Sequence, residues 1–487
     1  MNRISWPFYL ILLPLFFVFH GYEENYALVP AGSALWILAI YLLGTIAISA
    51  LLWVYFRNWS KAFFMTFFLV AYYFFFGSIH DFLKSHFENS FITRYTWLLG
   101  ISFLLFIAGS ILLKRSGKNF SKAFTYLNIL LALFIVVDLV QFGIKLYSPG
   151  VKAESLAVKS CDSTNVPHPD IYLIVADEYA GQKELLDLFN FDNKVFHDSL
   201  MARGLFVAKE SSSNYNYTLY SMASILNMEY LSLSQERIDK ASPPFAYQEI
   251  FNSKVISYFK GLGYRFYNHT YFDFKGNFTE SANSFVPSRT TLITSQTLSS
   301  RIEKELWHPT VSRLHWDWAL KKKKYENMHY NNELIASTSR ISSDRNLQPK
   351  FVYTHLEMPH YPYYYNSDGG EYPFEVLDTV TISNKEHYLG YLQYANKVLL
   401  NLVDTIMKNS VHPPVIILMS DHGYRRLTPK KDPALRFSNL FSIYLPNGNY
   451  AKVADTMSAV NVFRTVLNNQ FCQDLPMLPH RSISIEF

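Results

Sequence analysis

The 487-residue sequence contains only two cysteines, Cys161 and Cys472, so at most one disulfide can form within the chain. In an oxidising compartment these residues would join the two ends of the C-terminal part of the chain. The alternative is two unpaired thiols. Sequence does not decide between these alternatives, because it gives no distance between the two Cα atoms.

Basic runs interleaved with aromatic residues are also missing. The formal net charge is only +5, and together these two features argue against a nucleic-acid partner. The sequence shows neither an internal repeat nor a low-complexity tract. The chain is therefore not a repeat array.

Long apolar runs, in contrast, dominate the first 145 or so residues of a chain that is 49% hydrophobic. A helix needs about 20 residues to span a bilayer. Five stretches predict five spans: Trp6–His20, Leu35–Phe56, Phe63–Ile79, Tyr95–Leu113 and Phe124–Ile144. The first is short, but the residues that follow it offer no small-residue cleavage site, so we interpret it as a retained anchor and not as a signal peptide.

Lysine and arginine residues in the short links predict the orientation of these spans. The link after the first span contains Glu23 and Glu24 and no basic residue. The links after the second and fourth spans are basic, with Arg57, Lys61, Lys114, Arg115, Lys118 and Lys122. Basic links belong on the cytoplasmic side, so we expect a cytoplasmic N-terminus and an external C-terminal domain. Asp138 is the main charge within the spans. A transport pathway usually needs several such charges, which argues against a transporter.

Residues 147–169 form a polar linker, and residues 170–487 resemble an α/β domain. Runs that are apolar on both faces predict buried parallel strands at 171–176, 351–355 and 415–419, with 441–445 as a further candidate. Helical spacing predicts helices at 385–408 and 460–467. We therefore expect a helical membrane domain over 1–146 and a three-layer α/β/α domain over 170–487.

Acidic residues directly follow two of the expected strands. Asp177 and Glu178 follow the first, and Asp421-His422 followed by a glycine comes after a later one. Ligands of open α/β sheets bind beyond the carboxyl ends of the strands, although an acid there is often only a cap or a turn former. Carboxylates with one histidine suit zinc or manganese.

Two further residues are candidates for chemistry. Thr218 lies near the expected start of a helix, where backbone N–H groups favour an anion; the alternative is a plain N-cap. A metal held by Asp177, Asp421 and His422 would lower the pKa of the threonine hydroxyl and make it a nucleophile. His360 lies in a Pro-His-x-Pro loop and is a candidate for binding an oxyanion or donating a proton. A surface histidine in a turn is the alternative.

The order of these motifs resembles the alkaline phosphatase superfamily, and within it the sulfatase-like membrane proteins of the lipoteichoic acid synthase and phosphoethanolamine transferase type. Those proteins combine about five N-terminal spans with an extracytoplasmic α/β domain. The resemblance implies a metal site and a threonine nucleophile, Thr218. The implied metal ligands are Asp177, Thr218, Asp421 and His422, and the implied substrate-binding residues are His360, Glu178 and Arg425. In sulfatases a second acid, here Glu178, can also bind the metal.

Two departures narrow the expected chemistry. True sulfatases convert a Cys or Ser in a Cys/Ser-x-Pro-x-Arg motif to formylglycine, and no such motif follows residue 200. The second zinc of alkaline phosphatases needs an Asp-x-x-x-His pair and a late histidine, whereas Glu357 and His360 are differently spaced and His480 would have to serve as the late histidine. The resemblance therefore implies one divalent ion, zinc or manganese, with calcium or magnesium as alternatives.

These observations predict a membrane-anchored, metal-dependent phosphoryl-group transferase in the inner cell membrane, with its catalytic domain periplasmic or extracellular. Its substrate would be a lipid-linked or envelope phosphodiester. The first alternative is a hydrolase of sulfate or phosphate esters, with water as the acceptor. The second is a catalytically inactive envelope scaffold. The presence of Asp177, Thr218, Asp421 and His422 together argues against this alternative.

Overall fold

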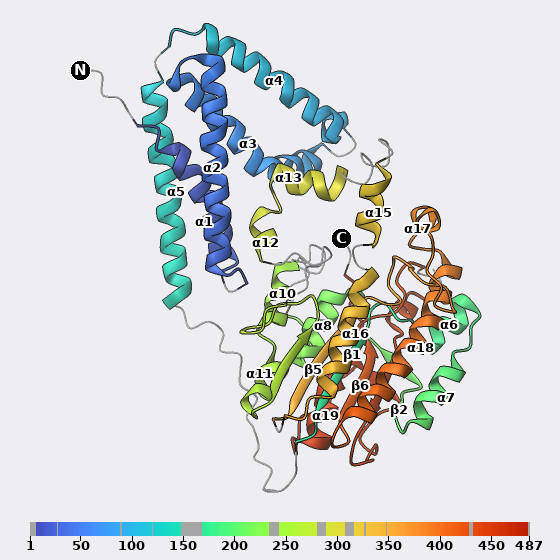
Figure 1. The fold of residues 1–487 in the computed structure, drawn as a ribbon. Coiled ribbons are helices and arrows are strands. Elements are labelled where there is room, and N and C mark those ends of the chain that lie inside the picture. The colour runs from blue at the N-terminus through green and yellow to red at the C-terminus, as the bar shows by residue number, and fades with distance from the viewer. Residues whose placement is uncertain are drawn as a thin grey trace. The chain divides into compact units, whose positions relative to one another are not determined.

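The structure, a computed structural model, describes residues 6–26, 28–87, 90–118, 120–147, 168–232, 243–279, 289–306, 316–325, 328–346, 348–427 and 432–485. The chain forms two compact units. The helical unit contains Met1–Val151 and Pro287–Asp317, and the α/β unit contains Lys152–Val286 and Trp318–Phe487. Figure 1 shows the elements of both units.

Five helices near the N-terminus build most of the helical unit. They are α1 (Tyr9–Glu24), α2 (Ala31–Phe56), α3 (Trp59–His86), α4 (Tyr95–Arg115) and α5 (Ser121–Tyr147), with a short turn η1 (Phe91–Thr93) before α4. Among the described residues, α2 to α5 are the four helices that are long and apolar enough to cross a membrane. The protein is therefore a membrane protein with about four spans.

The predicted first span is the exception. Helix α1 has 16 residues, which corresponds to about 24 Å and falls short of a hydrocarbon core of roughly 30 Å. It nevertheless follows α5 in the same direction. The Tyr9 amide donates to Asn128 Oδ1 at 2.6 Å, and His20 contacts Asp138 at 3.2 Å. Near the end of α1, Glu23 forms an ion pair with Lys145 at 2.8 Å.

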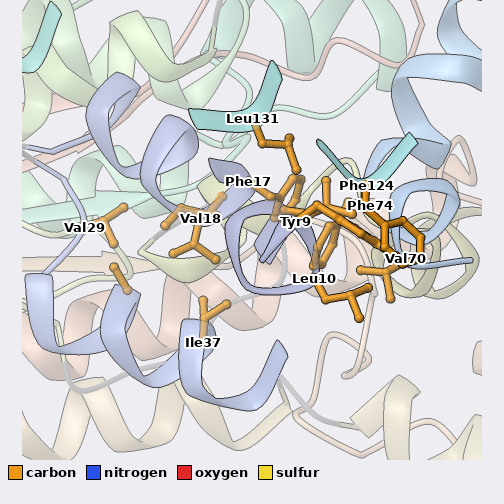
Figure 2. Packing of buried hydrophobic residues seen from close by; sticks show 13 residues of the cluster. Tyr9, Leu10, Phe17, Val18, Val29, Ile37, Val70, Phe74, Phe124 and Leu131 are labelled. Atoms are coloured by element: carbon orange, nitrogen blue, oxygen red, sulfur yellow. The ribbon is translucent and has the colours of Figure 1, made fainter. Parts of the chain in front are cut away.

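Aromatic packing holds α1 inside the helical unit (Figure 2). Tyr9, Leu13 and Phe17 of α1 are buried in one cluster with Phe74 of α3 and Leu131 of α5. The rings of Phe17 and Phe74 stack with centroids 4.3 Å apart. Because lipid is as apolar as these side chains, close packing and not water exclusion favours their association within a bilayer.

A segment distant in sequence completes the helical unit. It comprises α12 (Thr290–Thr294), α13 (Leu298–Arg301) and η2 (Ile302–Leu306), and it lies within the range assigned from sequence to the α/β domain. The Gly77 amide of α3 donates to the Gln296 carbonyl at 2.8 Å, and Arg301 forms an ion pair with Asp81. A Cβ at Gly77 would come within 2.2 Å of the Gln296 side chain, so glycine permits this close approach.

The α/β unit is built on a six-stranded sheet in the order β2-β7-β6-β1-β5-β4. Its strands are β1 (Ile171–Ala176), β2 (Phe206–Val207), β4 (Arg265–His269), β5 (Lys350–Leu356), β6 (Val415–Ser420) and β7 (Phe441–Tyr444), and a separate small sheet pairs β3 (Glu210–Ser212) with β8 (Thr456–Ser458). Strands β6, β1, β5 and β4 are parallel, whereas β7 and β2 are antiparallel to their neighbours. The predicted strands are confirmed, and β1, β5 and β6 are buried throughout.

Helices cover both faces of this sheet. The helical elements of the unit are α6 (Gln182–Phe189), α7 (Lys194–Ala202), α8 (Thr218–Asn227), α10 (Pro243–Phe251), α11 (Lys254–Gly261), α15 (Asp317–Tyr325), α16 (Met328–Ser342), α17 (Phe374–Thr379), α18 (Lys385–Asn409), α19 (Val462–Gln470), η3 (Pro433–Phe437) and η4 (Ala459–Asn461). On β5, Phe351 contacts Phe463 of α19, and Thr354 contacts Thr338 of α16 at 2.6 Å. Side chains at odd and even positions of a strand point to opposite faces. The arrangement is therefore the expected three-layer α/β/α fold.

One of the two cysteines, Cys472, follows α19 and is disulfide-bonded. The other cysteine, Cys161, lies outside the described residues, as does most of the predicted linker over 147–169. Of the two alternatives considered for Cys472, the disulfide is the one found.

Replacing Leu173 of β1 by alanine tests how much burial in this sheet contributes to the free energy of unfolding. Leu173 is fully buried, so Leu173→Ala should cost about 2–5 kcal/mol of unfolding free energy through lost burial and a residual cavity. Thermal unfolding of the detergent-solubilised full chain should show a clear decrease in Tm. Val195→Ala is the control, because Val195 is 79% exposed; equal shifts in the two variants would contradict the prediction.

Candidate active site and metal centre

The acids predicted from sequence meet at one edge of the sheet. Asp177 directly follows β1 and Asp421 directly follows β6. The parallel register places Ala176, the last residue of β1, beside Ser420 of β6 and Leu356 of β5. The carboxyl ends of three neighbouring strands therefore bring these residues together.

A group of three side chains has the geometry of a metal site. Ligand atoms of Asp177, His355 and Asp421 all lie within 4.8 Å of one another, and all three residues are buried. His355 was not predicted as a site residue. Its one signal in the sequence was a histidine in a run of residues that predicts a buried strand. Nδ1 of this histidine lies 2.8 Å from the hydroxyl of Tyr353.

His422 turns one ring nitrogen toward the same acids. Its Nε2 lies 3.4 Å from Asp421 Oδ2 and 3.8 Å from Asp177 Oδ1. Its Nδ1 lies 2.8 Å from the Gly423 carbonyl, which can only accept, so Nδ1 carries the proton and Nε2 presents a lone pair. Burial, helped by Arg425, lowers the pKa of His422 to about 3. The imidazole is therefore neutral, as a metal ligand must be.

The two acids carry charge that the chain itself does not neutralise. Burial, and then the nearby Asp421 and Glu178, raise the pKa of Asp177 well above its usual range. Among the described residues, no hydrogen bond reaches Oδ2 of Asp421. Oδ1 of Asp421 accepts from the Glu178 and His422 amides, but a buried carboxylate oxygen without a partner is costly unless a cation pairs with it. Two acids with neutral imidazoles match the donors preferred by zinc or manganese, so a divalent ion fits this site.

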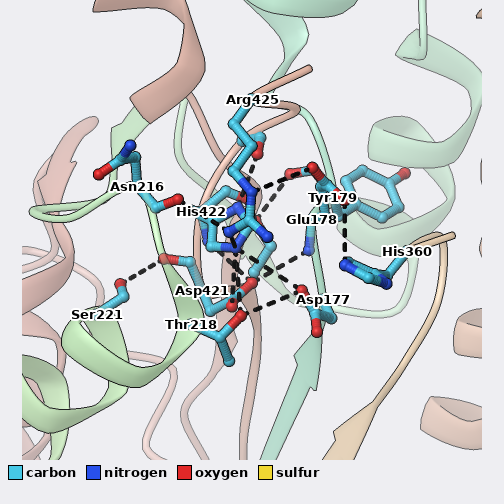
Figure 3. Close-up of polar contacts among 12 residues, drawn as sticks. Asp177, Glu178, Tyr179, Asn216, Thr218, Ser221, His360, Asp421, His422 and Arg425 are labelled. Carbon is cyan, nitrogen blue, oxygen red and sulfur yellow. Dashed lines mark hydrogen bonds and ion pairs between the residues drawn. The ribbon is translucent and has the colours of Figure 1, made fainter. Parts of the chain in front are cut away.

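Thr218 lies at the start of α8 and faces this group (Figure 3). Its Oγ1 lies 3.3 Å from His422 Nε2 and 3.5 Å from Asp177 Oδ1. The N-cap of α8 is Tyr217, and no side-chain cap bond forms. Thr218 is therefore the first helical residue, and its hydroxyl points to the acids and not back to its own helix.

Glu178 belongs to a second cluster, in which basic side chains outnumber the acid. Its carboxylate lies 3.1 Å from Arg426 Nε, 3.5 Å from His360 Nε2 and 3.8 Å from Arg425 Nε. Burial opposes ionisation, but His360 and the two arginines outweigh it and lower the pKa of Glu178. Glu178 also has a φ of 59°, a left-handed conformation that is uncommon outside glycine. Sequence reasoning missed Arg426, whose one signal was its place beside Arg425.

The side chain of Arg425 joins the two clusters. Its Nη1 lies 3.1 Å from His422 Nε2 and donates to the Asn216 carbonyl at 3.1 Å, while the guanidinium lies 4.2 Å from the ring centre of Tyr217. All residues predicted for the site are thus brought together: Asp177, Glu178, Thr218, His360, Asp421, His422 and Arg425. His480 instead contacts Ser458 and Ser482.

The family is shown by a comparison of the sequence with protein-family models. The model described as Sulfatase matches residues 171–468, which is most of the α/β unit and more than half of the chain. The chain belongs to the sulfatase family. It is thus a sulfatase-like enzyme of the alkaline phosphatase superfamily, as the order of its motifs predicted. A comparison with curated proteins finds no match to the chain.

Solved structures with similar folds include transferases and a hydrolase. The C-terminal periplasmic domain of EptC from Escherichia coli is 13% identical, with 65% of this chain and 86% of that chain covered and a TM-score of 0.39. The lipooligosaccharide phosphoethanolamine transferase EptA from Neisseria meningitidis is 12% identical over 95% of both chains, with a TM-score of 0.38. A phosphonate monoester hydrolase of Agrobacterium radiobacter is 14% identical over 62% of this chain and 74% of that chain, with a TM-score of 0.36.

Metal content provides a direct test of the site. The purified chain should hold roughly one divalent ion, and Asp421→Asn should lose it, because removing one charged ligand weakens a small donor set severely. Elemental mass spectrometry measures this directly. Glu184→Gln is the matched control, since Glu184 is also a buried acid but accepts a hydrogen bond from the Tyr424 amide at 2.9 Å outside the ligand group. Retention of the ion in Asp421→Asn would refute the assignment.

Proposed function

We propose that this protein is a membrane-anchored, metal-dependent phosphoryl-group transferase whose nucleophile is Thr218. The position of the Thr218 hydroxyl carries the proposal, since Oγ1 lies 3.3 Å from His422 Nε2 and 3.5 Å from Asp177 Oδ1. A zinc or manganese ion held by Asp177, Thr218, Asp421 and His422, with His355 within reach, would lower the pKa of the hydroxyl and stabilise charge on the phosphoryl oxygens.

The remaining residues of the site favour a bound phosphate ester. The N-terminal end of α8 carries the positive end of the helix dipole, which favours an anion. Arg425 and Arg426 add positive charge beside them, and His360 is placed to contact a phosphoryl oxygen. Attack by Thr218 Oγ1 forms a bond to phosphorus and displaces the alcohol of the donor. An acceptor hydroxyl then takes the phosphoryl group from the threonine.

The membrane helices favour a lipid-linked or envelope phosphodiester as the substrate. The basic links after α2 and α4 favour a location of the end of α5, and of the α/β unit that follows it in the chain, outside the cytoplasm. Helix α1 runs in the same direction as α5, which favours a cytoplasmic N-terminus. In this proposal the protein lies in the inner cell membrane with its catalytic unit periplasmic or extracellular.

Thr218→Ala tests the nucleophile. Turnover of a phosphodiester substrate should fall by roughly a thousandfold or more, because a covalent step is lost, while the metal content should remain near that of the wild type. Mass spectrometry of the wild-type chain quenched during turnover should find a peptide containing Thr218 whose mass is increased by the phosphoryl group together with its remaining ester substituent. Thr379→Ala, a change on exposed helix α17, is the control. Unchanged turnover in Thr218→Ala would end the proposal.

Ester hydrolysis is the second candidate, and the sulfatase family match favours it. Water would then replace the acceptor. Release of free phosphate or sulfate at full rate without an added acceptor would support the hydrolase, whereas dependence of turnover on an acceptor hydroxyl would support the transferase. Lack of both stoichiometric metal and turnover would instead indicate an inactive scaffold.

A further inference from the structure

An apolar groove runs between α3 and α4 within the helical unit. It has a volume of about 720 Å³. Phe68, Tyr72 and Phe75 line it from α3, and Leu105, Gly109 and Leu112 line it from α4. Spacings of three and four residues place these side chains on one face of each helix. The two faces thus lie opposite each other with a space between them.

Helix α4 packs weakly against the rest of the helical unit. Of its 21 residues, only Leu98 and Leu113 are buried. Near its start, the Tyr72 hydroxyl donates to Ser102 Oγ at 2.8 Å, and near its end Leu113 joins a small cluster with Met65. The stretch between these two attachments is about 16 Å long. Along it Phe106 packs edge-on against Tyr72, with ring centroids 5.4 Å apart, and the groove lies beside this contact.

The side chains that line the groove remain open to their surroundings. Phe68 is 45% exposed, Leu105 is 66% exposed and Leu112 is 69% exposed. In a bilayer these surfaces meet hydrocarbon and not water. The groove follows α3 from Phe64 to Ile79, a distance of about 22 Å along the helix, so a long acyl chain can lie along it.

Positive charge gathers at one end of the groove. Ser116 and Phe120 line that end. Lys118 lies in the adjoining link, and Lys61, Lys114, Arg115 and Lys122 lie at the helix ends next to the two links. Lys61 Nζ donates to the Lys114 carbonyl at 2.9 Å, which ties the two links together. Neither link contains an acidic residue. A cluster of this kind next to spanning helices attracts anionic lipid head groups.

We propose that the groove holds an acyl chain of an anionic phospholipid whose phosphate lies at this basic end. The lipid fills the space between α3 and α4 and completes the packing of α4. This site is separate from the catalytic residues, and its tests measure lipid binding and stability without any turnover.

Gly109→Phe fills the groove. A Cβ at Gly109 meets nothing within 4 Å and Gly109 lines the groove, so we expect the ring to occupy this space. In nanodiscs containing phosphatidylglycerol with a diazirine in one acyl chain, the wild type should crosslink at peptides of α3 and α4, and Gly109→Phe should crosslink there severalfold less. Gly100→Phe is the matched control, because a Cβ at Gly100 on the same helix also meets nothing within 4 Å and Gly100 does not line the groove.

Equal labelling of wild type and Gly109→Phe, or labelling spread evenly over α2 and α5, would overturn the acyl-chain site. Crosslinks between two copies of the chain at α4 would also overturn it, because a second copy would then cover the groove. Equal loss of labelling in Gly100→Phe would show that the effect is not local to the groove and would likewise count against the site.

The head-group half of the proposal has its own test. In delipidated protein, phosphatidylglycerol should raise the Tm more than phosphatidylcholine with the same chains. The double change Lys114→Gln and Arg115→Gln should remove this difference, whereas Lys84→Gln, at the opposite end of α3, should preserve it. Equal effects of the two lipids on the wild-type Tm would refute an anionic head group.

Discussion

Uncompensated negative charge at the carboxyl ends of β1 and β6 is the constraint on which the site depends. The parallel pairing of these strands brings Asp177 and Asp421 to one place, and burial removes the water that would otherwise solvate them. A fold that buries two acids this closely is destabilised unless a cation joins them. The sheet register therefore determines where a metal ion would bind and why these acids favour one.

The arginines of the site lie elsewhere. Arg426, together with His360, whose pKa burial lowers, surrounds Glu178 and not the metal-site acids. Arg425 lies between the clusters, with Nε toward Glu178 and Nη1 toward His422. This separation leaves the acids free for a metal ion while holding positive charge a few ångströms away, where a phosphoryl group would carry its negative oxygens. Glu178 thus serves to position these cations within the proposed mechanism.

Much of this could be predicted from sequence because fully buried strands are apolar on both faces and the chemistry follows them directly, as Asp177 and Asp421 show. Other features have no such local signal. His355 lies inside a strand, and its role depends on which strands become neighbours. The contact of Gln296 with Gly77 joins residues over 200 positions apart and follows no periodic pattern. Helix α1 has about the predicted length, but it begins at Tyr9 and ends at Glu24 and not at Trp6 and His20, because its sequence marks neither end with a capping side chain.

The orientation of the membrane helices rests on two independent arguments. In the proposed topology, the basic links after α2 and α4 set the direction of those helices and of α5 whether or not α1 crosses the bilayer. The charged contacts of α1 then fix α1 relative to α5, because burying Asp138 and Glu23 is costly unless His20 and Lys145 lie beside them. Those pairs form only when both helices run in the same direction. The short first helix therefore adopts the direction of a full span, although its length alone would not require it.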